Sequence, residues 1–201
     1  MSPRRDVRVE RTAQIIEAAT RLFAQHGIDQ TSMDMLAKTV GMSKGVLYWY
    51  FESKDAIILA LLEQLFNQPL LEVQALLQAP ESTAQRLTQL TTNLAAALEE
   101  LHSLVPLAQE LYALSARNNG VQSFLASYFQ RYRASLAALI QQGLERGEFS
   151  SINPEQIAWH LAALYEGSTV LWLLEPTPQR LTEQLQAALL LLLKAIVVRQ
   201  D

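Results

Sequence analysis

Apolar residues along this chain recur at intervals of three and four positions, and we find no alternating strand pattern bounded by turns. In the first stretch Ile15, Ala19, Leu22 and Phe23 follow the helical spacing, as expected when a helix buries one face. The pattern predicts a helix over about residues 8–25. Gly27 is expected to end it, because glycine readily adopts the left-handed backbone that closes helices.

Three closely spaced helix starts come next, each preceded by a residue suited to capping. Residues 31–34 fit the capping pattern [ST]-x-x-[DE], Ser43 precedes a second start, and Ser53 precedes a third, since short hydroxyl side chains accept hydrogen bonds from the first free amides of a helix. Gly41 stands where the first of these helices must end. The spacing predicts a helix, a turn and a second helix within about 20 residues, the size of a helix-turn-helix motif.

The remaining helical patterns are longer, and no linker rich in glycine or serine separates them from the first part. Ser82 with Gln85 forms a capping box, while Asn153 with Pro154 and Thr177 with Pro178 provide caps followed by a first-turn proline. The predicted helices are 54–78, with a possible bend at Pro69, then 83–101, 104–117, 121–146, 154–174 and 178–198.

These patterns predict an all-α fold. A three-helix N-terminal helix-turn-helix domain over residues 1–53 is joined directly to a C-terminal bundle of about six helices over residues 54–201.

Composition narrows the class of protein further. With 201 residues, 50% of them hydrophobic and 18% charged, the chain can bury a sizeable core and is not disordered. It has no cysteine, which excludes disulfides, a thiol nucleophile and cysteine-ligated zinc. We recognise no signal peptide, and the longest apolar run, 187–193, is far shorter than a membrane span. A soluble, cytoplasmic protein is expected.

The net charge of −4 by itself argues against nucleic-acid binding, because a DNA-binding surface must neutralise phosphates. The distribution of charge changes this conclusion. The first 55 residues carry a slight excess of basic groups, with Arg4, Arg5, Arg8 and Arg11 near the N-terminus, while the remainder is acidic.

The segment 31–54, TSMDMLAKTVGMSKGVLYWYFESK, combines this motif with an unusual aromatic run. Leu36, Ala37 and Val40 are expected to pack on the first helix. The inner residues of the second short helix are predicted to be Val46, Leu47 and Phe51. Lys44, Gly45, Tyr48 and Trp49 then point outward, with Tyr50 at one edge. Soluble proteins seldom expose such residues together without a partner.

The same segment closely resembles the DNA-binding domain of the tetracycline-repressor (TetR) family of bacterial transcription regulators. The family pattern is T-[TS]-[MV]-x-x-[IL]-A-x-x-x-G-[VM]-[ST]-x-G-x-[LI]-Y-x-[YH]-F-x-[ST]-K, and residues 31–54 match it at nearly every constrained position. A motif this long is highly specific. By motif the resemblance covers about residues 9–60, and beyond them it extends only to the length and order of the helices.

The resemblance implies which residues meet DNA. Thr31 or Ser32 would approach one phosphate, Lys44, Gly45 and Tyr48 would face bases, and Tyr50 and Lys54 would hold phosphate across the groove. Val46 stands where many relatives have threonine, so one hydroxyl contact is missing. Arg4, Arg5 and Arg8 form either an arm reaching the DNA or a solvated tail. The full predicted DNA-binding set is Thr31, Ser32, Ser43, Lys44, Gly45, Tyr48, Trp49, Tyr50 and Lys54.

Two other chemistries have partial support in the sequence. Residues 41–45 satisfy G-x-S-x-G, the nucleophile elbow of α/β-hydrolases, but that elbow needs a preceding strand; Ser43 is better interpreted as a helix cap. His26, His102 and His160 stand alone, without a partner at metal-ligand spacing. We therefore predict no catalytic residue, no metal, no cofactor and no enzyme activity.

The C-terminal part offers candidates for a ligand pocket and for a dimer interface. Aromatic residues there either pack in the core or line a pocket between helices, and the predicted pocket residues are Tyr112, Phe124, Tyr128, Trp159 and His160. The last helix is apolar on more than one side, so it must be buried twice. With the helix 154–174 it is predicted to form a four-helix bundle across a two-fold axis, through Ala163, Gly167, Leu185, Leu189 and Leu192.

Together these features predict a homodimeric, ligand-responsive repressor. It binds a palindromic operator in double-stranded DNA and is released by a small, mostly apolar or aromatic effector, whose binding moves the helix that begins at Lys54. The alternative is a helical carrier or enzyme that keeps the fold without binding DNA.

Overall fold

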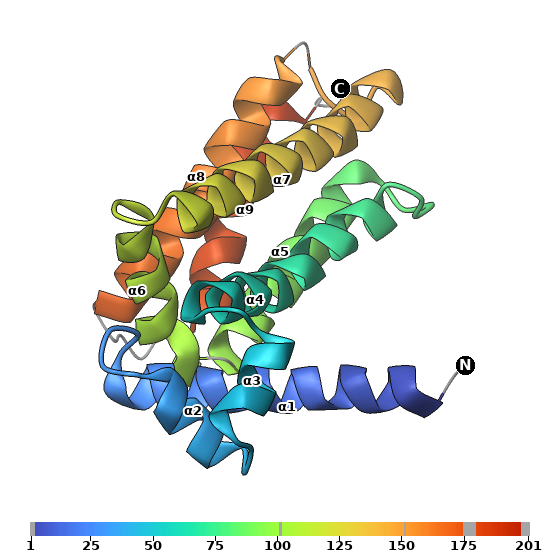
Figure 1. Cartoon of the computed structure of the whole chain (residues 1–201). Helices are drawn as coiled ribbons and strands as arrows, with labels where there is room; N and C mark the ends of the chain where they lie inside the picture. The colour runs from blue at the N-terminus through green and yellow to red at the C-terminus, as the bar shows by residue number, and fades with distance from the viewer. Residues whose placement is uncertain (1–2, 101, 151, 175–179, 198–201) are drawn as a thin grey trace. The chain divides into compact units, whose positions relative to one another are not determined.

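The structure is a computed structural model that describes residues 3–100, 102–150, 152–174 and 180–197. Within these ranges it contains nine α-helices, one 3-10 turn and no strand, which confirms the all-α prediction (Figure 1). The elements in chain order are α1 Pro3–His26, α2 Met33–Thr39, α3 Lys44–Tyr50, α4 Lys54–Leu76, α5 Thr83–Glu100, η1 His102–Leu104, α6 Val105–Ser115, α7 Asn119–Glu145, α8 Pro154–Leu174 and α9 Leu181–Ile196.

The helices pack into two compact units. The first contains residues up to Phe66 together with Ser103–Ala126, and the second contains Asn67–His102 and the residues from Ser127 onward. The division into these units falls inside α4 and inside α7, because α6 and the start of α7 pack into the same core as α1–α4. The domain boundary expected after residue 53 stays a prediction.

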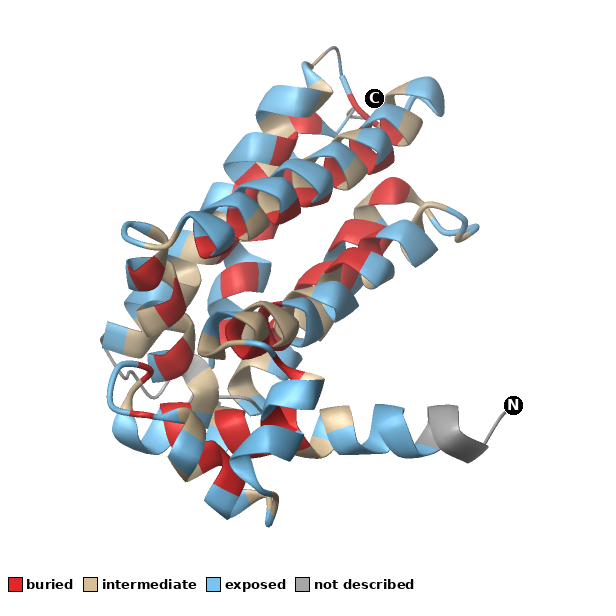
Figure 2. Ribbon diagram, in the orientation of Figure 1, coloured by how far each residue is buried: buried red, intermediate tan, exposed pale blue. Residues whose placement is uncertain are grey.

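The core of the first unit joins the three N-terminal helices to α4, α6 and the start of α7. Ile15, Phe23, Leu36, Leu47 and Ile58 are fully buried there (Figure 2). Leu107, Leu111 and Val121 fill the remaining side of this core. Since burying an aliphatic side chain contributes about 1.5–3 kcal/mol, these segments, distant in sequence, stabilise one another.

Helix α1 begins earlier than expected, at Pro3 and not near residue 8. Proline suits the first position of a helix, because its missing amide has no partner there in any case. The side chains of Arg4 and Arg5 lie outside the described residues. Residues 7–10 are exposed, so no apolar stripe was available to reveal this part of the helix.

The second unit is a bundle in which α9 contacts both α5 and α8. Leu181, Leu185, Leu189, Leu193 and Ile196 form the buried stripe of α9. Its first turn receives a carboxylate from α5: Glu99 accepts hydrogen bonds from the backbone amide (3.0 Å) and the hydroxyl (3.2 Å) of Thr182. A negative charge at this position also complements the helix dipole. The caps predicted at Thr177 and Pro178 lie outside the described residues.

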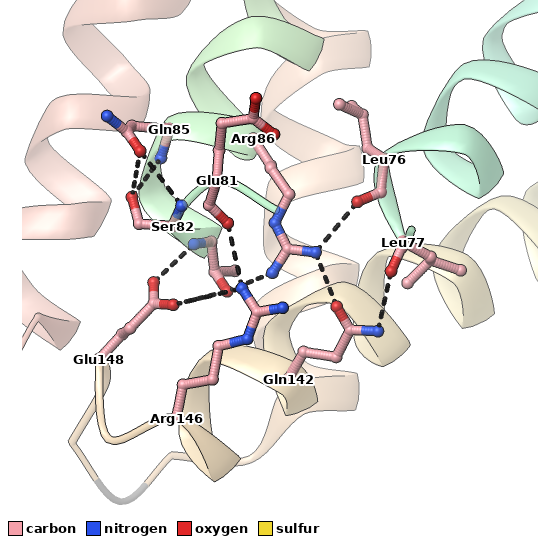
Figure 3. Close-up of polar contacts among 10 residues, drawn as sticks. Leu76, Leu77, Glu81, Ser82, Gln85, Arg86, Gln142, Arg146 and Glu148 are labelled. Carbon is pink, nitrogen blue, oxygen red and sulfur yellow. Dashed lines mark hydrogen bonds and ion pairs between the residues drawn. The ribbon is translucent and has the colours of Figure 1, made fainter. Parts of the chain in front are cut away.

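A buried arginine, Arg86, joins the C-terminal end of α4 to α5 and α7 in the second unit. The Arg86 guanidinium donates to the Leu76 carbonyl (3.0 Å), to Gln142 Oε1 (2.7 Å) and to Thr83 Oγ1 (2.8 Å), while Gln142 Nε2 donates to the Leu77 carbonyl (Figure 3). Burial lowers the pKa of Arg86. Because a positive charge beside free carbonyls complements a helix C-terminus, Arg86 fixes the end of α4 to α5 and α7. The sequence analysis missed this residue.

Local capping signals located most helix ends correctly. The Ser82–Gln85 capping box is formed by two reciprocal bonds, and Asn153 Oδ1 accepts from the Gln156 amide at 2.9 Å. Helix α8 has the predicted bounds. The segment expected as one helix over 104–117 is shorter, with a 3-10 turn before α6 and Pro106 in its first turn.

Helix α4 passes through Pro69 without ending. By length and composition alone it could cross a membrane, and it is the one such helix among the described residues. Within the first unit its residues Ile57, Ile58, Leu61 and Leu62 are buried in the protein core. These buried residues account for its apolar character without a membrane.

Candidate nucleic-acid interface

Two short capped helices form the motif predicted from the sequence. Ser32 Oγ accepts a hydrogen bond from the Met35 amide (3.2 Å) at the start of α2, and Ser43 Oγ accepts from the Val46 amide (3.3 Å) at the start of α3. Gly41, with φ of +68°, allows the chain to turn between them. A helix precedes Ser43, so the nucleophile-elbow interpretation fails and the serine acts as a cap.

Helix α3 presents almost its whole surface outward. Leu47 is its one buried residue, whereas Lys44, Gly45, Tyr48 and Trp49 are exposed, as predicted. The expectation for Val46 was wrong, because its side chain is 46% exposed. Tyr50, at the end of this seven-residue helix, is half-buried and also packs on the core, while the other positions are left available to a partner.

Gly45 has no evident role in the fold. Its φ is not positive, and a Cβ added there would meet no atom within 4 Å. Glycine destabilises a helix by roughly 0.5–1 kcal/mol relative to alanine. No described contact of the fold therefore requires glycine at this position.

Trp49 is the most exposed aromatic residue of this surface, at 64%. Its ring meets Tyr50 edge-on, with centroids 4.8 Å apart, and the guanidinium carbon of Arg8 lies 5.1 Å from its ring centroid. Tyr50 itself is half-buried and packs on the core. Arg8 therefore lies in α1 over an aromatic ring and not in a solvated tail, and whether it reaches DNA stays a prediction.

An ion pair joins the two helices of the motif. Lys44 Nζ lies 2.8 Å from Asp34 Oδ1, and both side chains are more than half exposed. The hydrogen bond and charge of Asp34 raise the pKa of Lys44. Lys44 is therefore cationic at neutral pH and is engaged by a carboxylate.

Thr31 does not belong to the surface. Its side chain is fully buried, and Thr31 Oγ1 lies within hydrogen-bonding distance of the Leu22 carbonyl (3.3 Å) and the Gly27 carbonyl (2.9 Å). The prediction that this hydroxyl approaches a phosphate is wrong, since it secures the end of α1. Ser32, next in the chain, is exposed at the start of α2.

Lys54 is also used inside the protein. Its ammonium donates to the carbonyls of Ile28 (2.8 Å) and Thr31 (3.0 Å), with the Asp29 carbonyl at 3.5 Å. An ammonium has three donors, and all three are directed at the loop between α1 and α2. This corrects the prediction that Lys54 holds phosphate: it positions the loop that leads into α2.

The same loop is held from α6 by two residues that the sequence analysis missed in this role. Glu110 Oε1 accepts from the Ile28 amide at 2.8 Å, and Arg117, just beyond α6, pairs with Asp29 at 2.7 Å. These partners are 82 and 88 residues apart. No local pattern reveals such contacts.

The predicted pocket residues are distributed over both units. Tyr112 and Phe124 lie in the first unit, each ring edge-on to Phe66, at 6.5 and 6.2 Å. Tyr128 is buried in the second unit. Trp159 and His160 are exposed on α8 of the same unit, where Trp159 lines a surface pocket with Phe129, Arg133, Ala162, Ala163 and Glu166. The assignment of these residues to a ligand pocket stays a prediction.

Three buried tyrosines with polar neighbours occur inside the second unit. The rings of Tyr128 and Tyr132 are stacked, with centroids 5.8 Å apart, and Tyr165 Oη lies 2.7 Å from Thr91 Oγ1. Since Thr91 donates its single proton to the Leu87 carbonyl, Tyr165 is the donor to Thr91. The Tyr132 hydroxyl is buried and has no hydrogen-bond partner among the residues that the structure describes. Burial raises the pKa of all three hydroxyls, so they remain protonated.

The predicted interface residues divide into two groups. Ala163 and Gly167 are exposed on α8, and Leu192 is half-buried. Leu185 and Leu189 are buried within the chain, so they are not available to a second subunit. The large exposed apolar residues of this region are Trp159, Val170, Leu171, Leu174, Leu190 and Leu191.

Among the residues that the structure describes, no group of three or more histidine, aspartate or glutamate side chains could hold a metal ion.

A capped helix pair with an exposed, partly basic second helix defines a helix-turn-helix DNA-binding protein. Residues 15–61 match the sequence model of bacterial regulatory proteins of the tetR family, and residues 80–197 match that of the BetI-type transcriptional repressor C-terminal domain. The chain belongs to the TetR family and is a DNA-binding transcription regulator.

Individual relatives agree with this assignment. The chain is 29% identical over 138 residues to the regulator EthR of Mycobacterium tuberculosis, covering 69% of this chain and 63% of that protein. The solved structure of Salmonella enterica GusR superposes with a TM-score of 0.76 at 26% identity, covering 96% and 98% of the two chains. A SmeT–triclosan complex shares the fold, with a TM-score of 0.84 at 20% identity over 94% and 92%.

Proposed function

We propose that this chain is a cytoplasmic repressor that binds a palindromic operator as a homodimer, placing α3 in the major groove. The observation that carries the proposal is Gly45, an exposed helical glycine without a positive φ, where an added Cβ would have no atom within 4 Å. A DNA backbone or base edge lying against α3 supplies the reason for it. Lys44 and Tyr48 flank it on the same exposed helix, where they can reach base edges.

Phosphate contacts are assigned to groups that the structure leaves accessible. Ser32 and the first amides of α2 form one anchor, since helix N-termini bind anions. Trp49 and Arg8 form a second, with Tyr50 at its edge. Thr31 and Lys54 are excluded from this set because both are occupied inside the protein.

The substitution Gly45→Ala tests the proposal directly. Alanine fits the free protein, so the free energy of unfolding is expected to rise by about 0.5–1 kcal/mol. Operator affinity is expected to fall by about tenfold or more, because the new methyl group lies where the DNA approaches. Gel-shift titration with DNA from upstream of the protein's own gene measures the affinity, and urea unfolding measures the stability.

The control for this experiment is Leu71→Ala, which shortens an exposed apolar side chain of α4 and should leave DNA binding unchanged. If Gly45→Ala binds the operator as tightly as the wild type, α3 does not contact DNA in the way proposed. If the wild type binds no upstream DNA at all, the alternative of a carrier or enzyme with this fold gains support.

The effector is proposed to be a small, mostly apolar or aromatic molecule that carries one hydrogen-bonding group. The partnerless hydroxyl of Tyr132, beside the stacked ring of Tyr128, supports this chemistry. A buried hydroxyl without a partner costs about 1–3 kcal/mol, which a ligand's polar group can recover. The fold is shared with SmeT, which has been solved with triclosan.

Tyr132→Phe separates this proposal from simple core packing. Removing an unpartnered hydroxyl is expected to stabilise the free protein by roughly 1 kcal/mol while reducing the stabilisation by effector. Thermal-shift measurements with a panel of aromatic compounds read out both effects. Loss of stability without any change in effector response contradicts a role for Tyr132 in binding.

A further inference from the structure

The Asp34–Lys44 pair is an unusual feature for a surface that binds DNA. DNA attracts proteins chiefly through its phosphates, and this attraction does not depend on sequence. Lys44 is a cation of the exposed recognition helix, yet its ammonium lies 2.8 Å from a carboxylate. The surface therefore contains a negative charge beside one of its few positive charges.

The geometry places this carboxylate on the DNA-facing side of the motif. Asp34 lies in the first turn of α2 and Lys44 in the first turn of α3, and the two helices contact each other. Asp34 does not cap α2, since that role belongs to Ser32. Both side chains are more than half exposed, and an exposed ion pair contributes little to stability because water screens it. A carboxylate in the first turn also complements the dipole of α2, which accounts for an acid at this position but not for its contact with Lys44.

We propose that Asp34 is a specificity-determining residue. Its ion pair with Lys44 keeps that ammonium from binding phosphate, and its own negative charge repels the DNA backbone. Lys44 leaves Asp34 only when it binds a base edge in the operator. On random DNA both effects weaken binding. On the operator, a guanine N7 or O6 acceptor replaces the carboxylate as the partner of Lys44. Discrimination against the wrong partner thus comes from a repulsive group as well as from attractive contacts.

This inference rests on the proposal that α3 contacts the operator. It predicts that Asp34→Asn raises affinity for random DNA by about threefold to tenfold, because one repulsive charge is lost and one lysine is freed. Affinity for the operator should rise much less. The ratio of the two affinities therefore falls, and the salt dependence on random DNA becomes steeper by about one unit.

Glu17→Gln is the matched control. Glu17 forms an exposed ion pair with Arg21 at 2.9 Å on α1, so its substitution changes the net charge by the same amount and breaks a pair of the same kind. It should change neither affinity ratio nor salt slope. Asp34→Glu keeps the negative charge, so it should retain most of the wild-type preference for operator over random DNA. Asp34→Asn should raise the affinity for random DNA less in a Lys44→Gln protein than in the wild type, because no lysine is then freed.

The test uses the full-length protein with two duplexes of equal length, one carrying the operator and one of random sequence, titrated at several salt concentrations. An equal change of both affinities in Asp34→Asn, or an equal effect of Glu17→Gln, overturns the proposal. A loss of operator affinity in Asp34→Asn also overturns it, because Asp34 would then assist recognition. A wild type that shows no preference for the operator would instead count against the proposed function itself.

Discussion

At the scale of single residues, two lysines of the N-terminal unit have opposite uses. Lys54 donates to backbone carbonyls of the α1–α2 loop, whereas Lys44 is exposed on α3. Lys54 stands at a constrained position of the family pattern and Lys44 at an unconstrained one, but the pattern does not show what either ammonium contacts. The difference arises because the carbonyls that receive Lys54 are brought together only by the folded loop.

Replacing each lysine by methionine distinguishes these roles. Lys54→Met removes the donor of buried and half-buried carbonyls, so the free energy of unfolding is expected to fall by about 1–3 kcal/mol. Lys44→Met should leave stability within about 0.5 kcal/mol of the wild type, as for most surface substitutions, but should reduce operator affinity. Urea unfolding and DNA titration of both variants provide the measurements. Equal stability of the two variants would show that the carbonyl contacts of Lys54 contribute little.

At the scale of helices, local sequence signals predicted helix ends, which depend on neighbouring residues. They missed contacts between segments that are distant in the sequence. The bounds of α8 follow from Asn153 and Pro154, and the start of α5 follows from Ser82 and Gln85. Val46 was assigned to the inner face from its apolar side chain, yet the core contacts of α3 are made by Leu47 and Tyr50, and Val46 is 46% exposed. Glu110 is brought to Ile28 across 82 residues, a contact that no helical periodicity encodes.

Arg86 shows how elements are joined in the second unit. Its substitution by methionine keeps the aliphatic stem but leaves the Leu76 carbonyl and Gln142 Oε1 without their donor. The expected loss in free energy of unfolding is roughly 2–4 kcal/mol. Gln89→Ala, an exposed position on the same helix, should change stability by less than about 0.5 kcal/mol. An unchanged urea midpoint for Arg86→Met would mean that this cluster does not stabilise the end of α4.

At the scale of the whole molecule, we predict that the exposed apolar residues of α8 are where a second subunit binds. Gly167, Leu171 and Leu174 recur at helical spacing, and Leu171 is 61% exposed. Small residues beside large ones allow two helices to approach closely. Dimerisation through α8 and α9, with Leu190 and Leu191 in place of the buried Leu185 and Leu189, remains a prediction.

Because Leu171 is exposed, Leu171→Arg should preserve the fold of each subunit while placing like charges across a two-fold axis. The mass in solution, measured by light scattering, is expected to fall from that of a dimer to that of a monomer, and operator affinity should fall with it. Leu71→Arg, which introduces the same charge at an exposed leucine of α4, serves as the control. A dimeric Leu171→Arg protein would place the interface elsewhere.

The division of the chain into two units inside α4 and α7 has a consequence for its synthesis. The first unit takes its core from residues up to Phe66 and again from Ser103–Ala126, with Leu111, Val121 and Leu125 among the buried contributors. On the ribosome, the three N-terminal helices therefore emerge long before the chain that completes their core. The first unit can finish folding only after the residues up to Ala126 have left the exit tunnel, and a nascent chain stalled earlier would expose Leu47, Ile58 and Leu62 to chaperones.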